Sequence, residues 1–170
     1  MRETRNSRLL VVEDDQVNRI ILKRYLEKEG HQVTLAANGK EALELLAKQV
    51  FEMVLLDIEM PVMNGFQVLE KMTTDPVLRE VPVVVISGVE ELNSVVRCIQ
   101  MGAEDYLTKP VNRILLKARM DASLEKKRLR DKQTTLLRKL EREMNIARHT
   151  QMSILPDHLQ KNELLAGNAL

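Results

Sequence analysis

Short apolar runs alternate along most of the chain with longer stretches in which apolar residues recur at helical spacing. The apolar runs occupy residues 9–12, 31–35, 53–56, 81–86 and 105–107. The helical stretches cover 16–29, 67–75 and 90–101, and two more begin at 39 and after 110. Strands that alternate with helices in this way are typical of a parallel, doubly wound sheet. We therefore predict an α/β fold with a five-stranded parallel sheet.

The helical spacing also predicts which side chains face the sheet. The expected buried faces are Val17, Ile21, Leu22, Tyr25 and Leu26 in the first helix, Ala42, Leu43, Leu46 and Ala47 in the second, and Leu92, Val95, Val96 and Ile99 in the fourth. Asn38 and Glu41 have the spacing of a capping pair, and Gly30 and Gly102 mark helix ends. Pro110 is expected to open the fifth helix.

The pattern changes after residue 116, where charged residues become frequent and no turn signal interrupts 112–155. The residues that recur every seventh position are Leu115, Ala122, Leu129 and Leu136, followed four positions later by Leu140. This spacing predicts a dimeric, parallel coiled coil over 112–151, although Arg119, Lys126 and Gln133 occupy the alternate core positions. Beyond Leu140 the apolar set shifts by one residue, as in a stutter. A single exposed helix with salt-bridged sides is the alternative.

Composition excludes several function classes. The net charge is +1 and aromatic residues make up 2% without any Trp, so neither a global basic field nor stacking platforms suggest nucleic acid as a partner. The basic run at 126–130 fits a solvated helix face better than a nucleic-acid contact. The lone Cys98 is expected to be a buried thiol. Without a membrane-length apolar run or a signal peptide, we expect a cytoplasmic protein that does not bind a membrane.

Polar side chains stand where four of the predicted strands end. Glu13 and Asp14 follow 9–12, Asp57 follows 53–56, Ser87 follows 83–86, and Lys109 lies just after 105–107. The carboxyl ends of parallel strands meet at one edge of a sheet, where such folds bind ligands. Three carboxylates placed together repel one another, and a hard divalent cation such as Mg²⁺ relieves that repulsion. The pattern therefore predicts a site for a divalent cation such as Mg²⁺ at this edge of the sheet.

Four motifs in this order resemble the receiver domain of two-component response regulators. They are V-V-E-D-D at 11–15, L-L-D-I-E-M-P-V-M-N-G at 55–65, V-V-I-S-G at 84–88 and G-A-E-D-Y-L-T-K-P at 102–110. The resemblance covers residues 8–120 and implies strand order 2-1-3-4-5, as in flavodoxin-like folds. It also implies phosphotransfer from a histidine kinase or histidine phosphotransfer protein to Asp57, with later self-catalysed dephosphorylation.

The same resemblance assigns roles to individual residues. Asp14 and Asp57 would bind Mg²⁺ directly, together with the backbone carbonyl of Glu59, while Glu13 would act through water; Mn²⁺ would substitute for Mg²⁺. Lys109 would stabilise the transferring oxygens, Ser87 would hydrogen-bond the phosphoryl group, and Tyr106 would be the switch residue. The Lys109–Pro110 bond is expected to be cis. A haloacid-dehalogenase-type phosphatase is set aside, because it needs an aspartate where this chain has Glu59.

The segment L-E-R-E-M-N-I-A-R-H-T-Q-M-S-I-L-P at 140–156 resembles the approach to protein phosphatases of the 2C family. The matching branch dephosphorylates serine or threonine on anti-sigma-factor antagonists. The paired metal-binding aspartates of such an enzyme are absent from this chain, so the activity would belong to a longer protein. The alternatives are the plain end of an amphipathic helix, a nucleotide or diguanylate cyclase output, and an unphosphorylated dimerisation scaffold.

The expected organisation is a loose tail over 1–7, a receiver over 8–120, and a coiled-coil linker over 112–151 that overlaps the receiver's end. The start of a truncated output domain would occupy 152–170.

Overall fold

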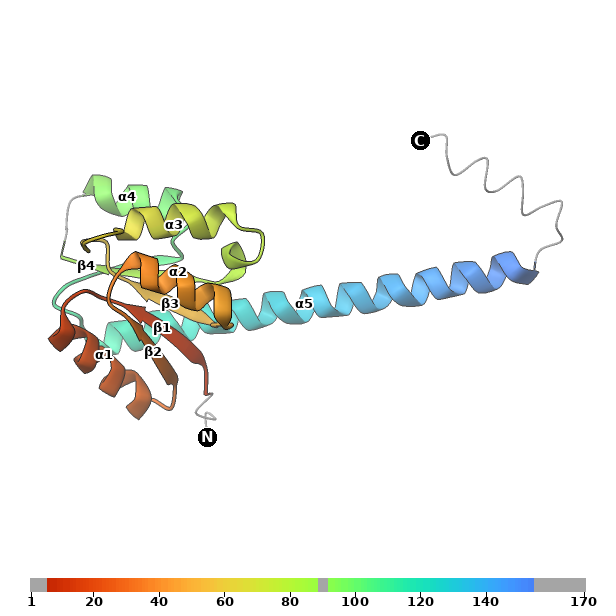
Figure 1. Ribbon diagram of the computed structural model, residues 1–170. Coiled ribbons are helices and arrows are strands. Elements are labelled where there is room, and N and C mark those ends of the chain that lie inside the picture. The colour runs from red at the N-terminus through yellow and green to blue at the C-terminus, as the bar shows by residue number, and fades with distance from the viewer. Residues whose placement is uncertain (1–5, 89–91, 155–170) are drawn as a thin grey trace. The chain divides into compact units, whose positions relative to one another are not determined.

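The computed structural model describes residues 6–88 and 92–154, and Figure 1 shows the order of its elements. In chain order they are β1 (Arg8–Val12), α1 (Gln16–Lys28), β2 (Gln32–Ala36), α2 (Gly39–Lys48), β3 (Met53–Leu56), α3 (Gly65–Thr74), a 3-10 turn (Leu78–Glu80), β4 (Val83–Ser87), α4 (Leu92–Gln100), β5 (Asp105–Thr108) and α5 (Arg113–Ile154). Residues 1–5, 89–91 and 155–170, which include most of the expected tail and output start, lie outside the described residues.

The five strands form one parallel sheet in the order β2-β1-β3-β4-β5, which confirms the predicted fold class and strand order. In its register Val12 of β1 pairs with Leu56 of β3, and Ser87 of β4 pairs with Thr108 of β5. Because paired residues end their strands together, the residues that follow them emerge side by side at the same edge. The register therefore sets up the polar edge that the sequence indicates.

Helices cover both faces of the sheet (Figure 1). A cluster of buried apolar residues lies on each face, between the sheet and its helices. One cluster packs α2, α3 and α4 through residues such as Leu46, Leu69 and Cys98. The other packs α1 and the first turns of α5 through Leu26, Leu116 and Met120. The thiol of Cys98 is buried as predicted, and burial raises its pKa. The strands are buried on both faces, which is why they appear as continuous apolar runs.

The predicted helix faces were too wide. Val17 and Ile21 of α1 are exposed, as are Ala47 of α2 and Leu92, Val96 and Ile99 of α4. Of the predicted residues, Leu22 and Leu26 in α1 and Ala42 and Leu46 in α2 are buried, and Tyr25 and Leu43 are partly buried against the core. In α4 the buried residue is Cys98. Since the strands themselves supply much of the apolar surface, a helix needs only its central row to cover them.

Local capping explains where the helices begin and end. Asp15 caps α1, Asn38 accepts a hydrogen bond from Glu41 N–H at α2, and Gly30 and Gly102 have left-handed φ values of 93° and 97°. The prediction that Pro110 opens the fifth helix was wrong. Asn112 instead accepts hydrogen bonds from the N–H groups of Ile114 and Leu115, so the helix begins at Arg113.

Contacts divide the chain into two units, Met1–Lys127 and Arg128–Leu170, and α5 has residues in both. Within the first unit, ion pairs join Arg119 to Asp105 at 3.1 Å and Lys126 to Glu104 at 2.6 Å. In the second, the described part of α5 exposes Leu129, Leu136 and Leu140.

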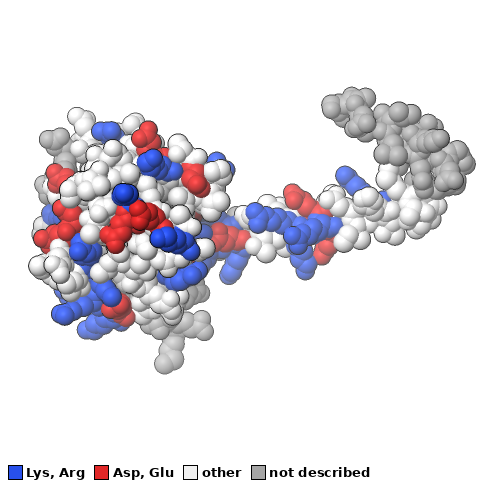
Figure 2. Space-filling view, in the orientation of Figure 1, with Lys and Arg blue, Asp and Glu red and all other residues white. Residues whose placement is uncertain are grey.

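Acidic and basic side chains intermingle on the visible face of each unit (Figure 2). Within the described residues, no helix combines the length and the apolar character needed to span a bilayer.

Ser123 provides a test of the packing between α5 and the sheet. Its hydroxyl is buried, and among the described residues it has no hydrogen-bond partner. A buried unsatisfied polar group costs about 1–3 kcal/mol, and alanine is also the better helix former by about 0.5 kcal/mol. Ser123→Ala should therefore raise the free energy of unfolding by about 1 kcal/mol or more, measured by urea denaturation.

Ser153→Ala is the matched control, because that exposed hydroxyl donates to the carbonyl oxygen of Thr150 on the same helix. Its effect should stay within about 0.5 kcal/mol. A loss of stability in Ser123→Ala would contradict the view that this hydroxyl is buried without compensation.

Candidate functional site

Three carboxylates converge where β1 and β3 end. Asp57 follows β3, donates its backbone N–H to the carbonyl oxygen of Val12 at 2.9 Å, and leaves only 3% of its surface exposed. Glu13 follows β1 and is similarly buried, whereas Asp14 is exposed at the rim. One carboxylate oxygen from each of the three lies within 4.8 Å of the others. At about 4 Å and an effective dielectric of about 20, two like charges repel by about 4 kcal/mol, so this cluster needs a counter-charge.

Lys109 supplies a positive charge from the end of β5. Its Nζ lies 2.7 Å from Asp57 Oδ2 and 2.8 Å from Glu13 Oε2. The backbone N–H of Lys109 donates to the carbonyl oxygen of Ser87 at 2.9 Å, which fixes the stem of the side chain beside β4. The Lys109–Pro110 bond is cis, as expected. Lys109 thus bridges two of the three carboxylates.

The titration properties of the site follow from these contacts. Burial raises the pKa of Glu13, and the negative charge of Asp57 raises it further, although the hydrogen bond from Lys109 opposes both effects. Burial alone would lower the pKa of Lys109, but its hydrogen bonds to Asp57 and Glu13 outweigh burial and raise it. Lys109 is therefore held as a cation in a pocket that disfavours the charged form of Glu13.

Ser87 and Tyr106 lie on the neighbouring strands β4 and β5. Ser87 is fully buried, Tyr106 is half-buried, and their side chains are hydrogen-bonded to each other. Burial raises the pKa of the Tyr106 hydroxyl, and the hydrogen bond to Ser87 partly offsets that effect. The ring also packs against the cluster that contains Cys98. The predicted phosphoryl-binding residue and the predicted switch residue are thus in direct contact.

The loop from β3 to α3 carries the remaining predicted residue, Glu59. Its backbone N–H donates to Asp57 Oδ1 at 3.1 Å, while its side chain is exposed and is not one of the three clustered carboxylates. A Cβ on Gly65 would collide with the carbonyl oxygen of Asp57, so only glycine lets α3 start this close to the site. The exposed Val62 of this loop has a left-handed φ of 68°, a strained conformation for a β-branched residue.

Arg19 is a residue that sequence reasoning missed. Its Nη1 donates to the carbonyl oxygens of Glu13 at 2.5 Å and Asp14 at 3.1 Å. Its position four residues after the cap Asp15 places it above the acidic loop, since residues four apart share a helix face. That spacing was available in the sequence, but an arginine in the first turns of a helix usually marks a solvated face.

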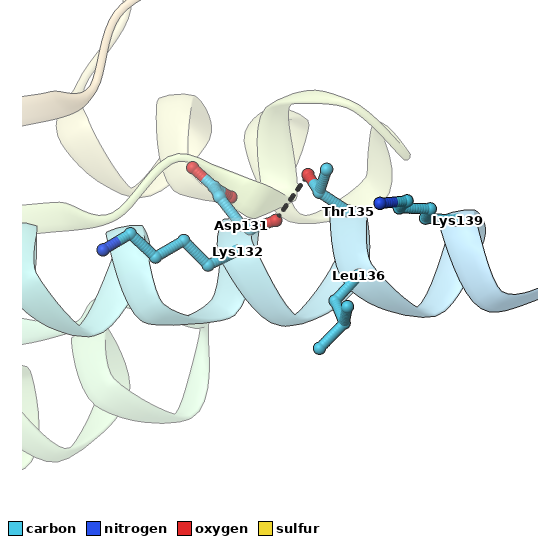
Figure 3. Close-up of a pocket in the computed structure, with 5 residues that line it drawn as sticks. All are labelled: Asp131, Lys132, Thr135, Leu136 and Lys139. Carbon is cyan, nitrogen blue, oxygen red and sulfur yellow. Dashed lines mark hydrogen bonds between the residues drawn. The ribbon is translucent and has the colours of Figure 1, made fainter.

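A shallow depression also lies on α5, lined by Asp131, Lys132, Thr135, Leu136 and Lys139. All five residues belong to this one helix, and Figure 3 shows Leu136 pointing away from Asp131 and Thr135. The Thr135 hydroxyl donates to the carbonyl oxygen of Asp131, within the helix. The depression is a helix surface, not a convergence of polar groups. Among the described residues, the oxygen cluster at Asp57 is the arrangement suited to a hard cation.

Comparison with known proteins agrees with this geometry. The profile of the response regulator receiver domain matches residues 9–121. Protein PilH of Pseudomonas aeruginosa is 36% identical over 69% of this chain and 98% of its own length. Response regulator PleD of Caulobacter vibrioides is also 36% identical, over 68% of this chain. The chain covers only 25% of the length of PleD.

A solved structure with a bound metal has a similar fold. The receiver domain of the sensor histidine kinase PA1611 from Pseudomonas aeruginosa PAO1 superimposes with a TM-score of 0.66 at 27% identity, covering 71% of this chain and 99% of its own. That structure has a magnesium ion coordinated in its active-site cleft. The order of the strands, the acidic edge and the profile match over residues 9–121 lead to one conclusion: this chain belongs to the family of response regulator receiver domains.

Proposed function

We propose that this chain accepts a phosphoryl group on Asp57 in a Mg²⁺-dependent reaction. Receiver domains take that group from a histidine kinase or a histidine phosphotransfer protein, and we assign the same donors here. The observation that carries the proposal is the 2.7 Å contact between Lys109 Nζ and Asp57 Oδ2 in a buried, strand-end pocket. A lysine in this position forms an ion pair with the nucleophile before the reaction and can form one with an oxygen of the transferred group afterwards.

The oxygen donors fit a magnesium ion. Asp14 and Asp57 would ligate it through carboxylate oxygens, the backbone carbonyl of Glu59 would add a third oxygen, and Glu13 would act through water. The closeness of the three carboxylates, within 4.8 Å, supports this set. Mg²⁺ prefers oxygen ligands and keeps several waters. When bound, the ion would neutralise charge on the oxygens of the transferring group; Mn²⁺ would serve in its place.

The chain's own residues account for the transfer itself. A carboxylate oxygen of Asp57 attacks phosphorus, the phosphorus–nitrogen bond of the donor breaks, and the electron pair stays on the imidazole nitrogen. The ammonium of Lys109 exchanges its contact with Asp57 for one with a phosphoryl oxygen. In a second displacement, water attacks the same phosphorus, the bond between phosphorus and the Asp57 oxygen breaks, and the electron pair stays on the carboxylate. Inorganic phosphate leaves, the proton of the water passes to solvent, and the result is self-catalysed dephosphorylation.

Ser87 and Tyr106 would convert that chemistry into a signal. A serine hydroxyl has one proton to donate, so a bond to the new phosphoryl group would change its bond with Tyr106, which the structure shows. Hydrogen bonds to charged groups are worth about 1.5–3 kcal/mol, enough to shift a two-state equilibrium at least tenfold. Tyr106 would then reposition against the core cluster that contains Cys98 of α4.

Replacing the nucleophile tests the central part of this proposal. Asp57→Asn keeps the shape of the side chain but removes the attacking carboxylate, so the variant should not take up phosphate from acetyl phosphate or phosphoramidate with Mg²⁺. Intact-mass spectrometry should show one added phosphate on the wild type. The same spectra will show whether a second residue accepts phosphate.

Asp75→Asn is the control, because Asp75 caps the turn at Leu78 through hydrogen bonds that asparagine can also accept. It should be phosphorylated at the wild-type rate. Wild-type labelling of the Asp57→Asn variant would refute the assignment.

We further propose that α5 pairs with a second copy of the chain in a parallel coiled coil. The seam residues Leu129, Leu136 and Leu140 are 52%, 58% and 46% exposed in the single chain. Helices gain most of their stability from packing an apolar face. Arg119 and Lys126, which would weaken the seam, instead form ion pairs with Asp105 and Glu104 of their own chain.

Charging the seam tests the dimer. Leu129→Lys combined with Leu136→Lys should convert the protein to a monomer that still accepts phosphate, as measured by light scattering at high micromolar concentration. Thr134→Lys with Thr135→Lys adds the same charge on the outer face of the helix and should leave the dimer intact. A wild type that scatters as a monomer with and without beryllofluoride would contradict the proposal.

The output of this receiver is a separate proposal. The resemblance at 140–156 favours a serine/threonine protein phosphatase beyond the coiled coil, controlled by the pairing of α5. The described part of that segment, to Ile154, is helical, as an approach to a following domain would be. A cyclase output and a dimerisation scaffold are the alternatives. The coding sequence downstream of residue 170 decides between them: a cyclase there would end the phosphatase proposal.

A further inference from the structure

The loop that carries two of the clustered carboxylates is held from outside the pocket by an arginine. Arg19 lies in α1, and its Nη1 reaches back to the carbonyl oxygens of Glu13 at 2.5 Å and Asp14 at 3.1 Å. A guanidinium nitrogen of this kind has two N–H groups, so one nitrogen can serve both carbonyls. The half-buried Arg19 side chain is thus committed to the backbone of the acidic loop.

One peptide group of the loop is fixed at both of its polar ends. The peptide between Asp14 and Asp15 is planar, so its oxygen and its N–H point in opposite directions. Arg19 donates to the oxygen, and the N–H donates to Glu13 Oε1 at 3.3 Å. The orientation of this plane sets the direction in which the Asp14 side chain leaves the backbone. It also ties Arg19, through the peptide, to the carboxylate that Lys109 contacts.

Arg19 brings a positive charge close to the acidic loop without forming an ion pair with its carboxylates. Lys109 Nζ already forms ion pairs with Glu13 Oε2 and Asp57 Oδ2. Had Arg19 paired with Asp14 in the same way, it would compete with any cation for the same lone pairs. Because it bonds to carbonyl oxygens instead, its positive charge offsets the repulsion in the loop and leaves the Asp14 carboxylate available.

We propose that Arg19 is a positioning residue for divalent-cation binding: it orients the 13–15 loop so that the carboxylates of Glu13 and Asp14 face Asp57. This inference rests on the proposed function, in which the cluster binds Mg²⁺. Residues that orient ligands from behind in this way affect metal affinity without touching the metal.

The test is a titration of the whole chain with MgCl₂ by isothermal calorimetry at constant ionic strength. Arg19→Met keeps the length of the stem and removes the donors, and it should raise the Mg²⁺ dissociation constant about 10- to 100-fold. Arg19→Lys retains a charged donor and should fall between Arg19→Met and the wild type. Arg24→Met, a change at an exposed arginine of the same helix, should bind as the wild type does.

Thermal unfolding in EDTA distinguishes a role of Arg19 in positioning the 13–15 loop from a role in stabilising the fold. The inference holds if Mg²⁺ binding weakens in Arg19→Met and recovers in part in Arg19→Lys, whatever happens to the melting temperature. It is overturned if both variants bind Mg²⁺ with the wild-type constant, even if they melt earlier. Should Arg19→Met not fold, the dissociation constant of Arg19→Lys alone decides between these two outcomes. A wild type that binds no Mg²⁺ would instead defeat the proposed function.

Discussion

Mutual repulsion among Glu13, Asp14 and Asp57 is the constraint on which the rest of the site depends. The parallel register ends β1 and β3 together, so burial of the sheet forces the residues that follow into one pocket. Glu13 and Asp57 are almost completely buried, and such charges persist only with partners. Lys109 meets this need from β5, which β4 separates from β3 in the sheet, and so links three strands through one ammonium group.

The ion pairs of Lys109 with two carboxylates also suggest how the pocket can respond to a ligand at Asp57. Lys109 is shared between two carboxylates, and any group that brings new negative oxygens to Asp57 competes for it. Next to it, Ser87 is bonded to Tyr106, whose ring packs near Cys98 under α4. In the proposed function, a change in charge at Asp57 would reach the surface of the first unit through these contacts.

Sequence patterns predicted the strands and their polar ends because buried strands and strand-end charges are local features. They were right for the centre of the helix faces, such as Leu26 and Leu46, but too wide at the edges, where residues such as Val17 stay exposed. How much of a helix the sheet can cover depends on packing. The capping bond of Asn38 was predicted, but other side-chain bonds to backbone were not. The contacts of Arg19 with two carbonyls, and of Asn112 with the start of α5, depend on loop geometry that residue types alone do not specify.

A crystal structure of the full chain grown with Mg²⁺ and beryllofluoride tests the central claim most directly. The account predicts a beryllofluoride group on the Asp57 carboxylate, a metal ion beside Asp14, and Lys109 Nζ moved from Asp57 Oδ2 to a fluorine. It also predicts Ser87 turned toward that group. An empty pocket at saturating ligand, with Lys109 still bridging Asp57 and Glu13, would contradict it.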